Sequence, residues 1–110
     1  MQLFRDMYVR THNGEIHKVV SPVIDNNNPK MNRFMDEDGN MTFFTEIKGK
    51  PSYRKYDILE DGDYIDGYKV VIADNGIKHL ETEKGLVFIG FVELIECKTI
   101  TTKEGYVYEC

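Results

Sequence analysis

The sequence predicts a small all-β domain, because of its glycine-marked turns, its short β-rich runs and its lack of helical periodicity. Asn13-Gly14 and Asn75-Gly76 each separate two β-rich runs. An Asn-Gly pair in that setting is a strong signal for a β-hairpin. No segment of ten or more residues repeats apolar side chains at helical spacing. Short strands with a turn every 8–12 residues or so are typical of a small SH3-like barrel or a β-sandwich, with at most one short helical turn.

The length indicates one domain. The chain has 110 residues, and compact domains most often have about 100–150, so residues 1–110 are expected to form a single mainly-β domain. No apolar run approaches the ~18 residues of a membrane span, and the N-terminus lacks the pattern of a secretory signal. We therefore expect a cytoplasmic protein with no membrane contact. Two cysteines, Cys97 and Cys110, are too few for a disulfide framework, and we expect free thiols.

The first hairpin is expected to join a strand over 3–11 to a strand over 15–24. A two-residue turn at Asn13-Gly14 pairs His12 with Glu15 and Arg10 with His17. In that register Val9 and His17 lie on opposite faces. Pro22 ends the second strand or marks it as an edge, because proline donates no ladder hydrogen bond.

The remaining strands are expected over 33–36, 41–47, 68–73, 77–81, 86–95 and 106–109, with 53–59 either a strand or irregular. Leu86 to Ile95 is the most continuously apolar run and is expected to be a central strand. Much of the core is expected to come from apolar residues of the second half of the chain, namely Ile58, Ile65, Val71, Ile72, Leu86, Phe88, Ile89, Phe91, Val92, Leu94 and Ile95. Thr101 and Glu104 fit a capping box, which predicts one helical turn there.

The stretch over 57–66 has the most distinctive composition. It holds five carboxylates and no Lys or Arg, Gly62 lies within it, and Gly67 follows it directly. Residues 1–56 carry a net charge of +2 and residues 57–110 a net charge of −7. An acidic half argues against direct nucleic-acid binding and favours docking on a basic protein surface. With the nearby tyrosines as aromatic anchors, the predicted binding residues are Asp57, Glu60, Asp61, Asp63, Tyr64, Asp66 and Tyr68.

We predict no reaction centre, and therefore no catalytic residues, no metal ligands and no cofactor. The acids at Asp61, Asp63 and Asp66 do not follow the every-second-position spacing of a calcium loop, and turn formation explains them better. His12 and His17 supply two ligands where zinc needs three or four. No phosphate loop, dinucleotide fingerprint or glycine-flanked nucleophile is present.

Three stretches carry a resemblance to a protein group. Arg10 to Ile16, Leu59 to Val70 (with its GDYIDGYKV run) and Lys98 to Glu104 resemble pieces of small uncharacterised proteins encoded by prophages and mobile elements of Firmicutes. In that group a "GDY-x-x-GYKV"-like turn precedes a terminal "I-x-T-x-E-Q-F"-like segment. Here Gly105-Tyr106 stands in place of Gln-Phe. The resemblance implies a phage or mobile-element setting and assigns no role to any residue.

Together these observations predict a non-enzymatic binding protein that acts in the bacterial host cell. Its partner is expected to be a host protein, with inhibition of a defence effector as the most concrete version. One alternative is an oligomer that sequesters a nucleotide-like signal. For that reading the candidate phosphate ligands are Arg5, Arg10, Lys18, Arg33, Arg54 and Lys55. Another alternative is an accessory or structural protein of a virion, and the sequence leaves the oligomeric state open.

Overall fold

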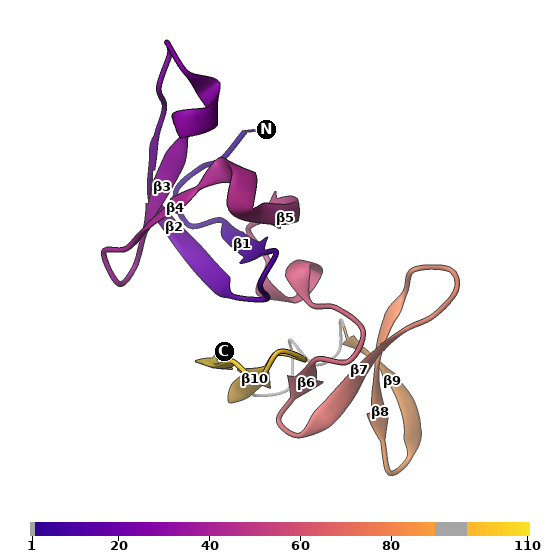
Figure 1. Cartoon of the computed structure of the whole chain (residues 1–110). Coiled ribbons are helices and arrows are strands. Elements are labelled where there is room, and N and C mark those ends of the chain that lie inside the picture. Colours follow the sequence, from indigo (N-terminus) through magenta and orange to yellow (C-terminus); the bar gives the residue numbers. More distant parts are fainter. Residues whose placement is uncertain (1, 90–96) are drawn as a thin grey trace. The chain divides into compact units, whose positions relative to one another are not determined.

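The structure is a computed structural model that describes residues 2–89 and 97–110. It divides the chain into two compact units, Met1–Ile58 (unit 1) and Leu59–Cys110 (unit 2) (Figure 1). Each unit contains one antiparallel sheet, which confirms the all-β fold class. The single domain expected over 1–110 stays a prediction.

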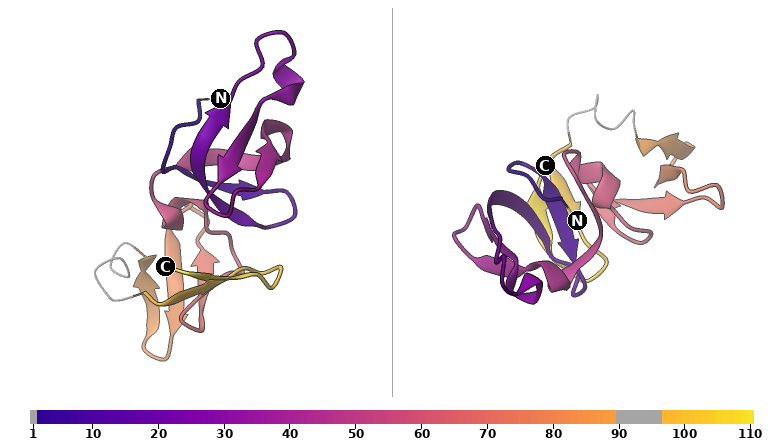
Figure 2. Two further views of the ribbon diagram at one scale, coloured as in Figure 1. Left: turned by 90° about the vertical axis from the view of Figure 1, so that its left-hand side faces the viewer. Right: turned by 90° about the horizontal axis from the view of Figure 1, so that it is seen from above.

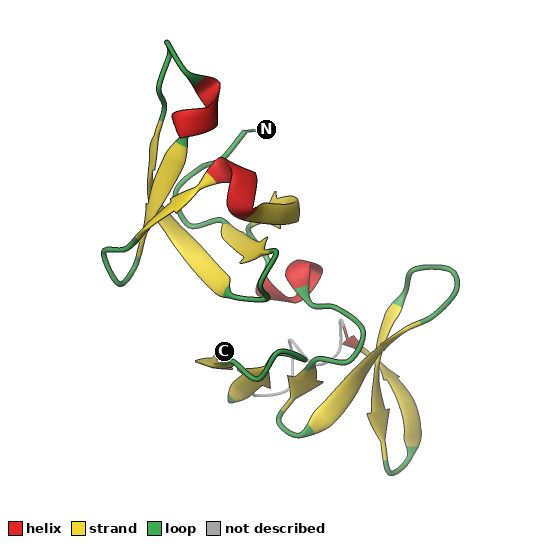
Figure 3. Ribbon diagram, viewed as in Figure 1, coloured by secondary structure: helices red, strands yellow, loops and turns green. Residues whose placement is uncertain are grey.

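Unit 1 has five strands in the order β4-β3-β2-β1-β5. The strands are β1 (Tyr8–Thr11), β2 (Ile16–Val23), β3 (Arg33–Asp36), β4 (Met41–Phe43) and β5 (Ile47–Ser52). Three single 3₁₀ turns accompany them, namely η1 (Pro29–Met31), η2 (Phe44–Glu46) and η3 (Lys55–Ile58) (Figure 3). These turns exceed the one helical turn that the sequence predicts.

The core of unit 1 forms where strands β1, β2, β3 and β5 meet. Its buried members are Leu3, Val9, Val19, Phe34 and Ile47, with Met7 and Phe44 packed against them. The strand expected over 41–47 would place the adjacent Phe43 and Phe44 on opposite faces. Instead β4 ends at Phe43 and η2 begins at Phe44, which turns the second ring onto the core.

The register of the first hairpin differs from the prediction by one residue. The structure pairs Val9 with His17 and Arg10 with Ile16. The loop has three residues rather than two: Gly14 N donates to Thr11 O at 3.0 Å, and Gly14 takes a φ of 91°. A one-residue shift moves every side chain of a strand to the other face. His17 consequently shares a face with Val9 and the core.

The same three-residue loop occurs four times in the part of the chain that the structure describes. In each copy the loop glycine N–H donates to the carbonyl three residues earlier, and the N–H of that earlier residue donates to the carbonyl of the residue after the glycine. The four loop glycines are Gly14, Gly39, Gly76 and Gly105, all with positive φ. Asp66-Gly67 is different, because both residues have positive φ and Ile65 pairs directly with Tyr68. It is the two-residue turn that the sequence predicts elsewhere.

Unit 2 has six strands in the order β11-β10-β6-β7-β8-β9. They are β6 (Tyr64–Ile65), β7 (Tyr68–Ile72), β8 (Lys78–Thr82), β9 (Gly85–Phe88), β10 (Thr99–Thr101) and β11 (Val107–Glu109). Figure 2 shows β7 and β8 side by side in orange and the β10–β11 hairpin in yellow. The order from β9 to β10 repeats that from β4 to β5 in unit 1, although the sequence shows no repeat.

One face of the unit 2 sheet is buried and the other is exposed. Ile65, Val70, Leu80 and Ile100 are buried. Leu86 and Phe88 keep 58% and 48% of their surface exposed, so the prediction that they lie in the core is wrong. Over residues 86–89 the predicted central position is wrong too, because β9 lies at the edge of the sheet among the described residues. Residues 90–95 of that prediction lie outside the described residues.

The chain closes with the β10–β11 hairpin. The predicted helical turn at Thr101 is instead a hairpin loop, in which Gly105 N donates to Thr102 O at 2.8 Å. Cys97 and Cys110 are joined in a disulfide with their Cα atoms 5.8 Å apart, which corrects the expectation of free thiols. The antiparallel pairing explains the closeness of the two cysteines, because Cys110 N donates to Lys98 O at 3.1 Å.

Within residues 2–89 and 97–110, the helices are all too short and too polar to span a lipid bilayer.

Candidate functional site

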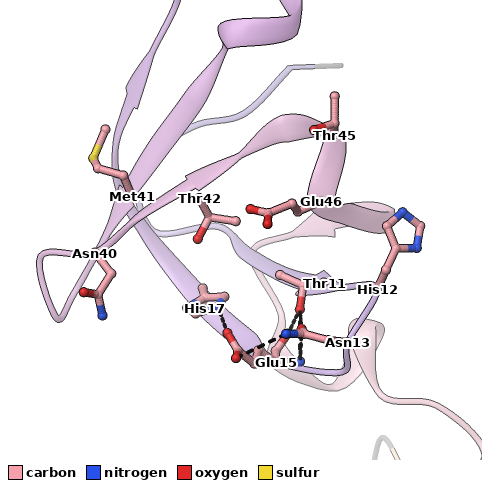
Figure 4. Close-up of a pocket in the computed structure, with 10 residues that line it drawn as sticks. All are labelled: Thr11, His12, Asn13, Glu15, His17, Asn40, Met41, Thr42, Thr45 and Glu46. Atoms are coloured by element: carbon pink, nitrogen blue, oxygen red, sulfur yellow. Dashed lines mark hydrogen bonds and ion pairs between the residues drawn. The ribbon is translucent and has the colours of Figure 1, made fainter.

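Unit 1 contains a groove of about 520 Å³, which we call the hairpin groove (Figure 4). The β1–β2 turn and the start of β2 form one wall, and β4 with η2 forms the other. Its lining residues are Thr11, His12, Asn13, Glu15, His17, Asn40, Met41, Thr42, Thr45 and Glu46.

The first wall is fixed by the three-residue loop. Thr11 N donates to Glu15 O at 2.9 Å, and Glu15 N donates to Thr11 Oγ1 at 3.1 Å. The Asn13 side chain bridges the turn, with its Oδ1 bonded to the Thr11 hydroxyl and its Nδ2 donating to Glu15 Oε1 at 3.3 Å. These bonds hold the Glu15 carboxylate over the start of β2 (Figure 4).

His17 lies between two carboxylates at the floor of the groove. Its Nε2 is 2.9 Å from Glu15 Oε2, and its Nδ1 is 2.9 Å from Asp36 Oδ2. The edge of the imidazole faces the buried ring of Phe34, with ring centroids 6.2 Å apart. His17 is mostly buried and Asp36 is fully enclosed.

Asp36 is held by the β3–β4 turn that follows it. Its Oδ1 accepts hydrogen bonds from Asp38 N at 2.9 Å and from Asn40 N at 3.0 Å. An aspartate that accepts from the backbone of its own turn is a common turn-forming device. The turn therefore fixes the carboxylate whose other oxygen faces His17.

The second wall is built around η2. Glu46 Oε2 accepts from Phe43 N at 3.1 Å, and Glu46 O accepts from His12 N at 3.0 Å. The second bond ties this wall to the first. The groove is thus lined by two glutamates and two histidines and by no lysine or arginine.

These features suit the groove to holding a cation. An ammonium or guanidinium group is matched by carboxylate oxygens that are already held in place. Glu15 and Asp36 lie at opposite edges of one imidazole, so they do not converge on a single metal position. Among the described residues no group of three or more His, Cys, Asp and Glu is placed to hold a metal ion. The second ring nitrogen of His17 faces a carboxylate and not a hydroxyl or thiol, which differs from a nucleophile–base pair.

Two of the predicted binding residues serve internal bonds in unit 2. Asp63 is completely buried, and its carboxylate accepts from Glu60 N at 2.6 Å and from Lys103 N at 2.9 Å. The Asp66 carboxylate accepts from Lys98 N at 2.9 Å and from Thr99 N at 2.8 Å. Both side chains therefore connect the turns around β6 to the two ends of β10.

The other three carboxylates also have internal partners. Asp57 Oδ2 accepts from Ser52 Oγ at 2.6 Å, and Asp61 Oδ1 accepts from Ile72 N at 3.0 Å. Glu60 Oε1 is 2.7 Å from Lys103 Nζ. The composition of this stretch is explained to a large extent by turn formation.

Tyr64 and Tyr68 are 40% and 41% exposed. Tyr68 pairs with Ile65 across the hairpin, so it lies on the same face as Ile65. Neighbours in a strand point to opposite faces, so Tyr64 lies on the other face. The two rings cannot anchor one flat partner surface together.

The candidate phosphate ligands are also spread out. Arg10 is buried and donates from Nη1 to Ile58 O at 3.3 Å. Lys18 and Lys55 both approach the Tyr8 ring, with their Nζ atoms 5.8 Å and 5.0 Å from its centroid. Arg54 stacks on Tyr56 at 4.0 Å.

Burial lowers the pKa of the Lys55 ammonium below its usual value. The charge of Glu37 opposes this shift, and the charge of Lys18 adds to it. Two like charges thus meet beside one aromatic ring.

Sequence reasoning missed the hairpin groove because its members are far apart in the chain. Glu15 and Glu46 come from two turns, and His17 and Asp36 come from two strands. The one signal that could have found them is the register of the first hairpin, since the observed pairing sets His17 on the face of Thr11 and Glu15.

Comparisons of the chain with protein-family models, with curated proteins and with solved structures found no match.

Proposed function

We propose that this chain is a non-enzymatic binding protein that holds a basic side chain of a partner protein in the hairpin groove. The observation that carries the proposal is the lining of the groove, in which Glu15 and Glu46 supply carboxylates and no lysine or arginine is present. The volume of about 520 Å³ lies within the range of roughly 300–1,000 Å³ typical of ligand sites. An arginine or lysine side chain fits that space.

The groove is organised before a partner arrives. Glu15 is held by the Asn13 side-chain amide, and Glu46 is held by the Phe43 backbone amide. Side chains that are already ordered lose less conformational entropy on binding, which favours affinity. The proposed contact therefore lies in unit 1, and the acidic turns of unit 2 contribute through long-range attraction of a basic partner.

The resemblance to prophage and mobile-element proteins supplies the setting of the proposal. In that setting the partner is a protein of the bacterial host, and the chain acts in the cytoplasm by occupying it. A defence effector is the concrete case, because a basic surface that receives nucleic acid is open to an acidic competitor.

A peptide with one arginine tests the proposal. The probe is acetylated and amidated Gly-Ser-Gly-Arg-Gly-Ser-Gly, compared with the same peptide carrying uncharged citrulline in place of arginine. Glu15→Gln and Glu46→Gln should each raise the Kd of the arginine peptide about threefold, the effect of a partly exposed ion pair. The citrulline peptide should bind more weakly to all variants.

Glu83→Gln is the matched control. It removes the same charge from an exposed turn of unit 2 and should leave the Kd unchanged. Equal affinity for the two peptides, or an equal effect of Glu83→Gln and Glu15→Gln, would show general charge attraction and contradict the proposal.

A second candidate is the sequestering of a nucleotide-like anion beside Tyr8. The specific observation is that Lys18 and Lys55 approach the same ring, and that their mutual repulsion would be relieved by an anion. ADP at millimolar concentration should then raise Tm, and Lys18→Met should reduce the rise while Lys84→Met in the β8–β9 turn should not. A Tm that ADP leaves unchanged rules this candidate out.

A further inference from the structure

His17 has a charged neighbour at each edge of its ring. Its Nε2 lies 2.9 Å from Glu15 Oε2, and its Nδ1 lies 2.9 Å from Asp36 Oδ2. Asp36 Oδ2 is buried and makes no hydrogen bond in the described part of the chain, and the His17 imidazole lies beside it.

This geometry decides which protonation state of the ring fits. A neutral imidazole has one N–H donor and one acceptor nitrogen. In either neutral tautomer a nitrogen lone pair would face a carboxylate oxygen at 2.9 Å, which is repulsive. The doubly protonated ring donates from Nε2 to Glu15 and brings a positive charge beside Asp36 Oδ2, so the geometry fits an imidazolium.

We propose that the proton on His17 and the basic side chain of a partner compete for Glu15. The inference rests on the proposed function and adds its regulation. When His17 is an imidazolium, Glu15 is already neutralised by an internal cation. When His17 loses that proton, Glu15 becomes available and the groove gains one unit of negative charge. Binding of a basic side chain is therefore tighter at a pH at which the ring is neutral than at a pH at which it carries both protons.

Several titratable groups surround His17 and contribute to the pH dependence of binding. Glu15 faces it from the hairpin turn and Asp36 from β3, while Glu46 of η2 and His12 of the turn line the same groove. On β1 the residue opposite His17 is the apolar Val9. Asp36 keeps its backbone bonds in either state, so Glu15 is the carboxylate that exchanges partners.

Calorimetry on the unaltered chain is the direct test. The arginine peptide described above is titrated at pH 5.5, 6.5 and 8, and at pH 6.5 in two buffers with different heats of ionisation. We expect a Kd about fivefold lower at pH 8 than at pH 5.5, as for the gain of one partly screened charge near the ligand. At pH 6.5 binding should release a fraction of a proton to the buffer.

Two variants show which residue releases the proton. His17→Gln should abolish the release, and His12→Gln should keep it. A Kd that is equal at all three pH values, with no proton released, overturns the inference and leaves the proposed function standing. Release that persists in His17→Gln and disappears in His12→Gln overturns it as well. No binding of the peptide at any pH overturns the proposed function and the inference with it.

Discussion

At the scale of single residues, Asp63 shows how an acidic residue can be structural. The side chain is completely buried, and its two oxygens accept backbone hydrogen bonds from Glu60 and Lys103. A bond to a charged acceptor contributes about 1.5–3 kcal/mol, and a buried donor that loses its acceptor costs a similar amount. The carboxylate thus links the turn before β6 to the loop between β10 and β11.

Asp63→Ala should lower the free energy of unfolding by about 3 kcal/mol, since two backbone N–H groups lose the charged acceptor that the buried Asp63 side chain supplies. Urea unfolding followed by circular dichroism measures the loss. Asp61→Ala is the matched control from the same turn, because its exposed carboxylate accepts one bond, from Ile72 N, and should cost about 1 kcal/mol or less. Equal costs for the two variants would contradict the structural role assigned to Asp63.

The sequence shows the acids of residues 57–66 but not which of them are buried. Asp63 and Asp61 are two positions apart in the same acidic run, yet one is enclosed and the other is exposed. The difference arises from Lys103, forty residues later, whose backbone N–H reaches Asp63 only after β10 has paired with β6. Local composition carries no information about that pairing.

At the scale of elements, the hairpin loops decide where side chains point. The sequence places both Asn-Gly turns correctly but predicts a two-residue loop at Asn13-Gly14, where the structure has a loop of three. Both loop types need a glycine with positive φ, so the dipeptide alone does not separate them. The loop length becomes visible only in the pairing of the two strands that the loop joins. At the first hairpin the extra loop residue places His17 on the same face as Val9 and the core.

Gly76 isolates the backbone requirement of such a loop. Its φ is 81°, and a Cβ atom there would meet nothing within 4 Å. Gly76→Ala should therefore cost about 1–2 kcal/mol of unfolding free energy through backbone strain alone. Gly76→Asn should cost less, because asparagine tolerates this conformation better than alanine does. Urea unfolding of the two variants checks the order, and an alanine variant as stable as the wild type would contradict it.

Strand β9 shows a second limit of reading elements from sequence. Leu86 to Ile89 is apolar, which indicates a buried strand, but within residues 2–89 and 97–110 β9 pairs only with β8. Leu86 and Phe88 lie on the exposed face, whereas Ile89 is buried. Apolar character predicts that a segment is a strand, and its place within the sheet depends on the order of all the strands.

At the scale of the whole molecule, the fold class follows from the turns and the lack of helical periodicity, and the structure confirms it. The repeated strand order of the two units could not be predicted, because it lies in the pairing and not in the sequence. The charge asymmetry is a property of the sequence, with −7 in residues 57–110. Several of those carboxylates make hydrogen bonds or ion pairs within unit 2. The groove that suits a basic partner lies instead in residues 1–56, which carry a net charge of +2.

The location of a bound arginine side chain separates the two acidic regions most directly. The measurement is a titration of the ¹⁵N-labelled chain with the arginine peptide, followed by amide chemical shifts and corrected with the citrulline peptide. The largest shifts are predicted at residues 11–17 and 40–46, which line the hairpin groove. Shifts concentrated at residues 57–68, with none at the groove, would contradict the proposed function and return the binding surface to the acidic turns.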